Sequence, residues 1–331
     1  MKTISIVTPC YNEEANVEEL YRRVRAVMTE LGNYRYEHIF IDNASGDRTV
    51  ELLKRIAAQD TNVRVIVNAR NFGHVRSPIH AFYQTIGDAV ISMAADFQDP
   101  PEMLTSFVRK WEEGYSMVLA IKNASEENPL MFWLRKRYYR LVTRLSDIQT
   151  FENFTGFGLY DRRVIDIVKG FGDPYPYFRG MISEIGLPHA TIPFTQPRRK
   201  RGITKNNFYT LYDLAMLGIT NLSKVPLRIV TFCGFATAIL CMIVAFFYLI
   251  YKLVLWDNFS VGIAPLVIGI FFFGSVQLIS VGILGEYIGS IHTQVHHRPL
   301  VVERERVNFE YEPGLPVADP LRTESRTSQH G

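Results

Sequence analysis

The sequence predicts an α/β protein with a mostly parallel sheet and helices on both of its faces, followed by a two-helix transmembrane hairpin. In the N-terminal half, short β-rich runs alternate with runs whose apolar residues recur at helical spacing, a rhythm typical of parallel sheets. Near the C-terminus, residues 229–251 and 261–284 form two stretches without a charged residue. Each stretch is longer than the roughly 20 residues that a helix needs to cross a bilayer.

The elements of the N-terminal half follow from local patterns. The first helix is well marked, because Val17, Leu20, Val24 and Leu31 fall on one face. Asp47 is a suitable cap for the second helix, and two prolines stand where the first turn of the fourth helix tolerates them. The strands are expected within residues 3–9, 36–47, 63–74, 89–96 and 115–122. The helices are expected within residues 13–31, 48–59, 77–87 and 100–114.

Polar side chains gather where the first four strands end. They are Tyr11, Asn12 and Glu13 after the first strand, Asp42 and Asn43 after the second, Arg70 and Asn71 after the third, and Asp96, Gln98 and Asp99 after the fourth. Ligands of such sheets bind beyond the carboxyl ends of the strands, so this edge is the expected site. Carboxylates there can bind Mg²⁺ or Mn²⁺, whereas a single acid at a strand end is usually a simple cap. The sequence has no GxGxxG or GxxxxGK[ST], which excludes the ordinary dinucleotide and P-loop sites.

Asp99 has two interpretations. The residues "DPPE" (99–102) open a predicted helix, so an N-cap role is favoured for Asp99. The alternative is a general base or an orienting group within the site.

The charges around the hairpin predict its orientation. Basic residues gather before the first span, between Arg198 and Arg228, and again after the second span, between Arg298 and Arg306, whereas the connector holds only Lys252 against Asp257. The positive-inside tendency places the N-terminal domain and the tail in the cytoplasm. A pair of buried core helices is the alternative. It is disfavoured because two adjacent uncharged stretches of this length are hard to bury in a soluble domain.

The chain divides into four regions. Residues 1–205 are expected to form a cytoplasmic α/β domain, 206–228 an amphipathic juxtamembrane helix, 229–290 the hairpin, and 291–331 a cytoplasmic tail, with disorder expected after about residue 312. The juxtamembrane segment is equally consistent with an ordinary helix packed on the domain. "GEYIG" (285–289) has the small-xxx-small spacing that packs helices within a hairpin or between the protomers of a homo-oligomer.

Composition excludes other classes. With 47% hydrophobic and 21% charged residues the chain is not disordered overall, and a net charge of +3 is too small to argue for nucleic-acid binding. The cysteines, Cys10, Cys233 and Cys241, have no CxxC spacing, so reduced structural thiols are expected.

Several motifs carry a family resemblance. "TPCYNEE", "DNASGD", "NFGH" and "AADFQDPPE" resemble, in order and spacing, the nucleotide-sugar glycosyltransferases of the GT-A fold. With "TGFGLYDRR", "FRGMISEIG", "RKRGITK" and the hairpin, the chain resembles the polyprenyl-phosphate glycosyltransferases, which include dolichol-phosphate mannose synthase and the bacterial bactoprenol glucosyltransferases. The resemblance covers about residues 3 to 300 and implies a GT-A domain at residues 1–205.

The resemblance implies roles for the residues at the strand ends. Pro9, Tyr11, Asn12 and Glu13 match the first nucleotide contacts, Asp42 matches the acid that binds the base or ribose, and Asn71 is assigned to the nucleotide sugar. Asp96 matches the second acid of an Asp-x-Asp motif that holds a divalent metal, Mg²⁺ or Mn²⁺, on the diphosphate, and Gln98 matches a further metal or phosphate contact. The first acid of that motif is Ala94 here, so the metal preference is expected to differ.

The lipid acceptor carries a phosphate, which needs cations. "RRKRGITK" (198–205) supplies Arg199, Arg201 and Lys205 immediately before the hairpin, and Arg179 is a further candidate. Arginine offers bidentate phosphate geometry and lysine a point charge. The same run is also consistent with a phospholipid anchor, worth about 1 kcal/mol per residue at an anionic leaflet, or with a solvated face.

The resemblance implies a multi-pass enzyme of the cell inner membrane with both termini in the cytoplasm. Its expected reaction is metal-dependent, inverting transfer of a hexose to undecaprenyl phosphate, with glucose from UDP-glucose as the favoured donor. One alternative is another sugar, such as mannose from GDP-mannose. A second is a non-catalytic membrane scaffold that binds nucleotide sugars or lipids. A third, a processive polysaccharide synthase, is disfavoured because there are only two spans and no QxxRW motif.

Overall fold

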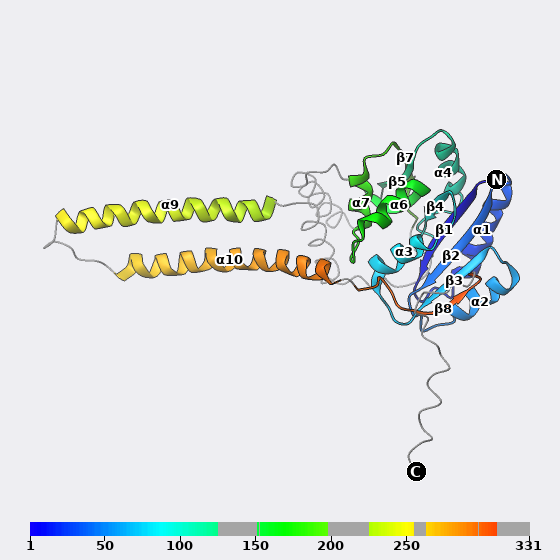
Figure 1. Cartoon of the computed structure of the whole chain (residues 1–331), viewed down its shortest axis with the longest axis horizontal. Coiled ribbons are helices and arrows are strands. Elements are labelled where there is room, and N and C mark those ends of the chain that lie inside the picture. The colour runs from blue at the N-terminus through cyan, green and yellow to red at the C-terminus, as the bar shows by residue number, and fades with distance from the viewer. Residues whose placement is uncertain (125–150, 152, 198–224, 255–262, 297, 310–331) are drawn as a thin grey trace, which may run out of the picture. The chain divides into compact units, whose positions relative to one another are not determined.

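The computed structural model describes residues 1–124, 151, 153–197, 225–254, 263–296 and 298–309 (Figure 1). The chain forms two compact units, which are described separately. The first holds the described residues up to 197 together with the C-terminal segment from His296, and the second holds the two long C-terminal helices.

The first unit is built on an eight-stranded sheet with the order β7-β5-β6-β4-β1-β2-β3-β8. Its strands are β1 (Thr3–Cys10), β2 (Arg35–Asp42), β3 (Val63–Asn68), β4 (Ala89–Ser92), β5 (Met117–Ala124), β6 (Phe154–Asp161), β7 (His189–Thr195) and β8 (Glu303–Val307). The central neighbours β4, β1, β2 and β3 run parallel, as does the β5–β7 pair. β6 is antiparallel to both of its neighbours, and β8 is antiparallel to β3. The mostly parallel sheet predicted from the sequence is confirmed.

Helices cover both faces of this sheet (Figure 1). They are α1 (Val17–Leu31), α2 (Thr49–Gln59), α3 (Gly73–Tyr83), α4 (Met103–Glu112), α6 (Arg162–Phe171) and α7 (Phe178–Ile185). The apolar sides of α1, α2 and α4 join one buried cluster, which includes Ile6, and those of α3, α6 and α7 join another, which includes Val7. Ile6 and Val7 belong to different clusters because successive side chains of a strand point to opposite faces.

Several elements differ from their predicted bounds, and two of them, α3 and β4, lie beside the loops that follow the strands. α3 begins at Gly73 rather than residue 77, because Oδ1 of Asn71 accepts the Gly73 N–H at 2.8 Å and satisfies one of the free amides of the first turn. β4 ends at Ser92 rather than residue 96, because the chain then folds into a loop in which Asp99 accepts a hydrogen bond from the backbone of Ala94.

The strand β8, which follows the long helices in the chain, is an element that the sequence analysis did not predict. It lies along β3, where Val302 accepts a backbone hydrogen bond from Ala69 at 2.9 Å. Glu303 bonds to both His80 and Arg306, and Lys54 donates to Glu305 at 2.6 Å. The C-terminal segment therefore closes the edge of the sheet that β3 would otherwise expose.

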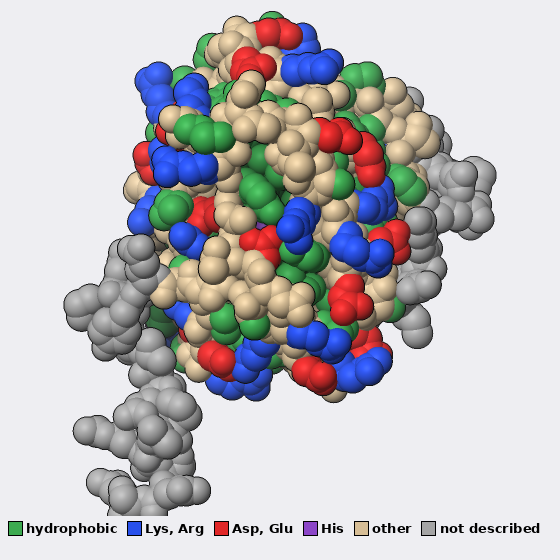
Figure 2. Space-filling model, turned by 90° about the vertical axis from the view of Figure 1, so that its right-hand side faces the viewer, with side chains coloured by type: hydrophobic (Ala, Val, Ile, Leu, Met, Phe, Trp, Pro, Cys, Tyr) green, Lys and Arg blue, Asp and Glu red, His purple; other side chains and the backbone are tan. Residues whose placement is uncertain are grey.

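One face of this unit is shown in Figure 2, which looks at the right-hand side of Figure 1. Basic and acidic side chains are interspersed over that face, with small apolar areas between them. Such a mixture is typical of a solvated surface.

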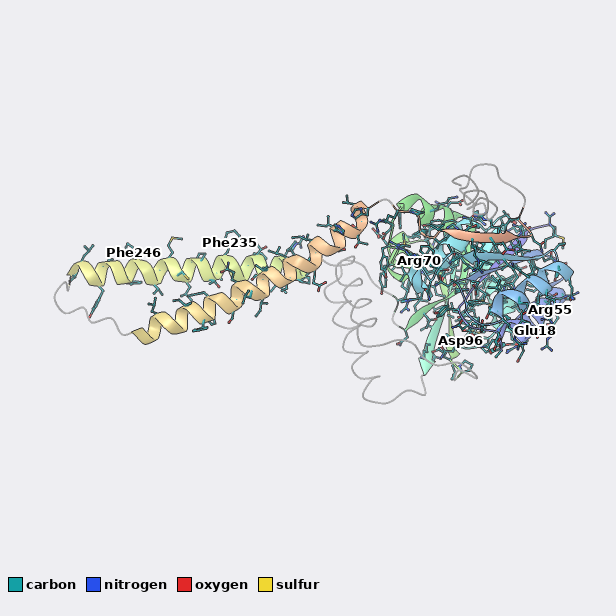
Figure 3. All side chains as sticks on the ribbon, turned by 90° about the horizontal axis from the view of Figure 1, so that it is seen from below. Glu18, Arg55, Arg70, Asp96, Phe235 and Phe246 are labelled. Carbon is teal, nitrogen blue, oxygen red and sulfur yellow. The ribbon has the colours of Figure 1, made fainter. Side chains whose placement is uncertain are left out.

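The second unit consists of α9 (Val225–Val254) and α10 (Ile263–Val295). Both helices are long and apolar enough to cross a membrane, with mean hydropathies of 2.2 over Val225–Val244 and 1.5 over Gly269–Val295. Their large apolar side chains are exposed, as Phe235 and Phe246 illustrate (Figure 3). The predicted juxtamembrane helix at 206–228 lies outside the described residues except for its last four positions, which open α9.

Candidate active site

The carboxyl ends of β4, β1, β2 and β3 lie next to one another, because these strands are parallel neighbours in the sheet. Cys10 at the end of β1 is in register with Asp42 at the end of β2, and Val7 of β1 with Ser92 of β4. The polar residues that follow these strands are therefore gathered at one edge, as the sequence predicts. In Figure 3, Arg70 and Asp96 lie in the left part of this unit, while Glu18 and Arg55, on α1 and α2, lie in the right part.

The loops after β1 and β2 are bonded to each other. Ser45 Oγ accepts the Asn12 N–H at 2.8 Å, and Asn12 Oδ1 accepts the Gly46 N–H at 2.8 Å. Asn12 has a φ of 57°, a left-handed conformation that asparagine tolerates. The two loops thus form one rigid wall of the site, with Asn12 at its centre.

Asp42 lies behind this wall and is fully buried. Its carboxylate accepts the Ser45 N–H at 2.9 Å and is also bonded by the Ser45 hydroxyl. Burial raises the pKa of Asp42, and the bonds from Ser45 oppose that effect. In this structure Asp42 positions Ser45, and its predicted contact with the base or ribose stays a prediction.

The other predicted nucleotide contacts on β1 differ in exposure. Pro9 is part of β1 and partly buried, whereas Tyr11 is exposed just beyond the strand. The Glu13 N–H donates to Thr49 Oγ1 at 2.8 Å, and the Glu13 carboxylate accepts from Asn16 at 2.6 Å. Tyr11 is the one of these three side chains that the surface presents most openly.

The loop after β4 presents the carboxylate of Asp96. Asp96 is 5% exposed, and its Oδ1 accepts the Gln98 N–H at 3.1 Å. Phe97 takes a φ of 62° and is buried beneath the guanidinium of Arg23, 5.0 Å from the ring centroid. A buried aromatic ring in this conformation anchors the turn that holds Asp96.

The N-cap interpretation of Asp99 is wrong. α4 begins at Met103 with Glu102 at the cap position, and Asp99 Oδ2 instead accepts the Ala94 N–H at 2.8 Å. Burial raises the pKa of Asp99 to about 7; the bond from Ala94 opposes this rise, and the nearby charge of Asp96 adds to it. Asp99 therefore closes the loop around Asp96, and its alternative role as a general base or an orienting group stays a prediction.

On the other side of the edge, the loop after β3 is held by an amide network that the sequence analysis did not single out. Asn43, at the end of β2, bonds to Asn68, Asn71 and the backbone of Phe72. Arg70 stacks on Phe72, with 4.0 Å from the guanidinium carbon to the ring centroid. The sequence does not indicate such a network, because its asparagines are scattered along the chain and come together only when the strands pair.

The basic residues predicted to bind the acceptor phosphate lie partly inside and partly outside the described residues. Arg179 lies in the first turn of α7, and it adds to the effect of burial in lowering the pKa of His74 on α3. It is also close enough to Tyr160 to influence the hydroxyl. Arg199, Arg201 and Lys205 lie outside the described residues.

A divalent cation at this edge would need oxygen ligands from the side chains that follow the strands. Within the described parts of the chain, no three His, Cys, Asp or Glu side chains form a group that could hold a metal by themselves. Mg²⁺, however, is usually held by one or two carboxylates together with substrate phosphates. The buried Asp96 carboxylate, with Gln98 beside it, fits that mode of binding.

Comparisons with known proteins give the family. Residues 5–168 match the family model of glycosyl transferase family 2. An uncharacterised glycosyltransferase of Synechocystis is 32% identical over 94% of this chain and 97% of its own length. The bactoprenol glucosyl transferase of Shigella phage SfV is 33% identical over 92% of this chain and 99% of its own. Glucosyl-3-phosphoglycerate synthase of Mycobacterium tuberculosis, solved with Mn²⁺, UDP and phosphoglyceric acid, is 18% identical, with a TM-score of 0.46 over 66% of this chain and 76% of that one. The chain belongs to glycosyl transferase family 2.

Proposed function

We propose that this glycosyltransferase moves a hexose from a nucleoside-diphosphate sugar to a polyprenyl phosphate at the cytoplasmic face of the inner membrane. Glucose from UDP-glucose and undecaprenyl phosphate are the proposed substrates. The observation that carries the proposal is the buried Asp96 carboxylate among polar strand ends, in a chain whose full-length relatives include bactoprenol glucosyl transferases.

The donor is a dianion, so its binding site must compensate the negative charge of the diphosphate. Asp96 and Gln98 would hold a divalent cation, which would supply Lewis acidity at the departing diphosphate. Asp99 holds the Asp96 loop in place through Ala94, and the bonded loops of Asn12 and Ser45 form the wall against which the nucleoside lies. Tyr11 is exposed beside that wall and is proposed to cover the base.

The acceptor is a phosphate oxygen that is already ionised at neutral pH. It needs no strong general base, but it does need cations that hold two anions together during transfer. Arg179 is the described candidate, and Arg199, Arg201 and Lys205 are proposed to complete the acceptor site. Direct attack by the phosphate oxygen on the anomeric carbon inverts the configuration there.

The two apolar helices are proposed to anchor the enzyme beside its lipid substrate. α9 and α10 supply the length and hydropathy that a hairpin needs. The basic residues that flank them favour cytoplasmic placement of both termini. A membrane anchor keeps the enzyme where a polyprenyl chain resides and shortens the search for the acceptor.

A donor screen tests this function. The purified full-length protein in detergent is mixed with undecaprenyl phosphate, a divalent cation and radiolabelled UDP-glucose, UDP-galactose or GDP-mannose, and label in the lipid phase is counted. The proposal predicts transfer from UDP-glucose. Transfer from GDP-mannose alone would assign the other sugar, and binding of nucleotide sugars without transfer would contradict an enzyme and favour a scaffold.

A further inference from the structure

The side chain of Asn43 makes a complete set of hydrogen bonds around the loop that follows β3. Its Oδ1 accepts from Asn68 Nδ2 at 3.1 Å and from the Phe72 N–H at 2.9 Å. Its Nδ2 donates to Asn71 Oδ1 at 2.9 Å and to the Gly73 carbonyl at 3.1 Å. Asn43 is 7% exposed and Asn68 is fully buried, so water does not compete readily for these bonds.

The orientations of the Asn43 and Asn71 side-chain amides follow from which neighbouring groups can only donate a hydrogen bond. A backbone N–H can only donate, so the atom of Asn43 that receives the Phe72 N–H must be its oxygen. The NH₂ group of Asn43 therefore faces Asn71. In the same way, the Gly73 N–H, 2.8 Å from Asn71, fixes the oxygen of the Asn71 amide on the inner side of the loop.

Asn71 is left with its NH₂ group turned away from this network. Its Oδ1 already receives two donors, from Asn43 and Gly73. Among the residues that the structure describes, no bond involves its Nδ2, and Asn71 is an exposed residue at the carboxyl edge of the sheet. The loop thus presents a fixed hydrogen-bond donor at the edge that carries the candidate active site, next to Arg70, whose guanidinium donates to the Asn71 carbonyl at 3.1 Å.

The family resemblance already assigns Asn71 to the nucleotide sugar. We infer that Asn43 is a positioning residue, which fixes the Asn71 amide so that its NH₂ group donates a hydrogen bond to an oxygen of that donor. This inference rests on the proposed function. Phosphate and carbonyl oxygens are acceptors only, so they need donors that face them. A donor whose rotamer is already fixed loses less entropy on binding, which is the advantage that Asn43 supplies.

Two substitutions separate the roles of the two halves of the Asn71 amide: the inner half is the oxygen that accepts from Asn43 and Gly73, and the outer half is the NH₂ group. Asn71→Asp keeps an oxygen for Asn43 and Gly73 but places an anionic oxygen where the NH₂ group was, whereas Asn71→Ala removes both halves. We expect the KM for the donor to rise about tenfold in Asn71→Ala, and more in Asn71→Asp, because the carboxylate repels the diphosphate. Because Asn71 is exposed, neither variant should unfold the protein.

Asn43 is tested through its effect on Asn71. Asn43→Asp keeps the acceptor of the Phe72 N–H but turns an oxygen toward Asn71 Oδ1 and the Gly73 carbonyl, so it should displace Asn71 and raise the donor KM about tenfold. Adding Asn71→Ala to that variant should cost little more, because the two residues act as a unit. Asn62→Ala, at the amino end of β3, removes an exposed amide that bonds to Asp60 and is the matched control, with an unchanged KM.

The outcomes are distinguishable. Unchanged donor KM in Asn71→Asp, or effects of Asn43→Asp confined to the melting temperature and to the active fraction, would contradict the inference while wild-type transfer stands. Fully additive effects of the two positions would likewise contradict the positioning role. Failure of the wild-type protein to transfer any sugar would contradict the proposed function instead, and the affinity for UDP in the same variants, measured by calorimetry, then tests the inference alone.

Discussion

The carboxylate of Asp99 accepts a hydrogen bond from the backbone N–H of Ala94 at 2.8 Å, and this bond closes the loop that carries Asp96. Ala94 stands where the family resemblance expects an acid. The backbone of this position, rather than its side chain, therefore takes part in the architecture of the site, and Asp99 is tied to it.

The first prediction concerns this bond. Asp99→Asn keeps an oxygen that can accept the Ala94 N–H, whereas Asp99→Ala leaves that amide without its acceptor. We expect Asp99→Ala to lower kcat/KM for sugar transfer about tenfold or more, since an unmet buried amide costs about 1–3 kcal/mol and the loop will move to avoid it. Asp99→Asn should retain most of the activity. Equal activity of Asp99→Ala and wild type would show that the loop holds Asp96 without this bond.

The second prediction concerns the pairing of β8 with the sheet. Glu303 is partly buried and bonds to His80 and Arg306. Burial raises its pKa, but these bonds outweigh burial, so the pKa lies below its ordinary value of 4.5. A lowered carboxyl pKa stabilises the fold above the unfolded value, and this stabilisation is lost as the pH falls through the folded pKa.

Glu303→Gln should therefore destabilise the protein by about 1–3 kcal/mol at pH 7, and the difference from wild type should shrink below about pH 4. Glu305→Gln is the control on the same strand. Its pair with Lys54 is 40% exposed on each side, so about 0–1 kcal/mol is expected. Thermal unfolding of the three proteins at pH 7 and at pH 3.5 checks this, and a Glu303→Gln effect that does not change with pH would contradict it.

The third prediction concerns packing at the opposite end of the sheet. A Cβ atom at Gly87 would lie 2.5 Å from Ser5 Oγ, 2.7 Å from Ser5 N and 2.9 Å from Thr3 O. Two of these atoms are backbone, so Gly87→Ala should destabilise the protein by about 1–3 kcal/mol. Gly170→Ala, in α6, meets nothing within 4 Å and should stabilise it by up to about 1 kcal/mol. Denaturant unfolding of both variants measures the contrast, which would fail if the two shifts had the same sign.

The sequence predicted the parts of the fold that depend on local pattern. Apolar runs such as Ile4 to Val7 alternate with helices such as α1, and this rhythm was enough to place four strand ends, and with them Asp42 and Asp96, at one edge. The two apolar helices were found for the same reason, because their composition is uniform over many residues.

The remaining features depend on contacts between distant residues. β8 is short and charged, and it is stabilised by partners such as Lys54, which lies 251 positions from Glu305 in the chain. Asp99 was misassigned because a carboxylate before a helix can cap it or accept from a loop amide, and only the folded turn decides. Asn43 and Asn68 were missed as a pair because their bond joins the ends of two strands.

The central claim is that Asp96 holds the donor through a divalent cation during sugar transfer. It is tested most directly by the transfer of radiolabelled glucose from UDP-glucose to undecaprenyl phosphate, with wild type, Asp96→Asn and Asp166→Asn, an exposed control on α6. The account predicts that a chelator abolishes transfer by the wild type and that Asp96→Asn lowers kcat about a hundredfold with unchanged thermal stability, while Asp166→Asn behaves as wild type. Full activity of Asp96→Asn, or of the wild type in excess chelator, would contradict it.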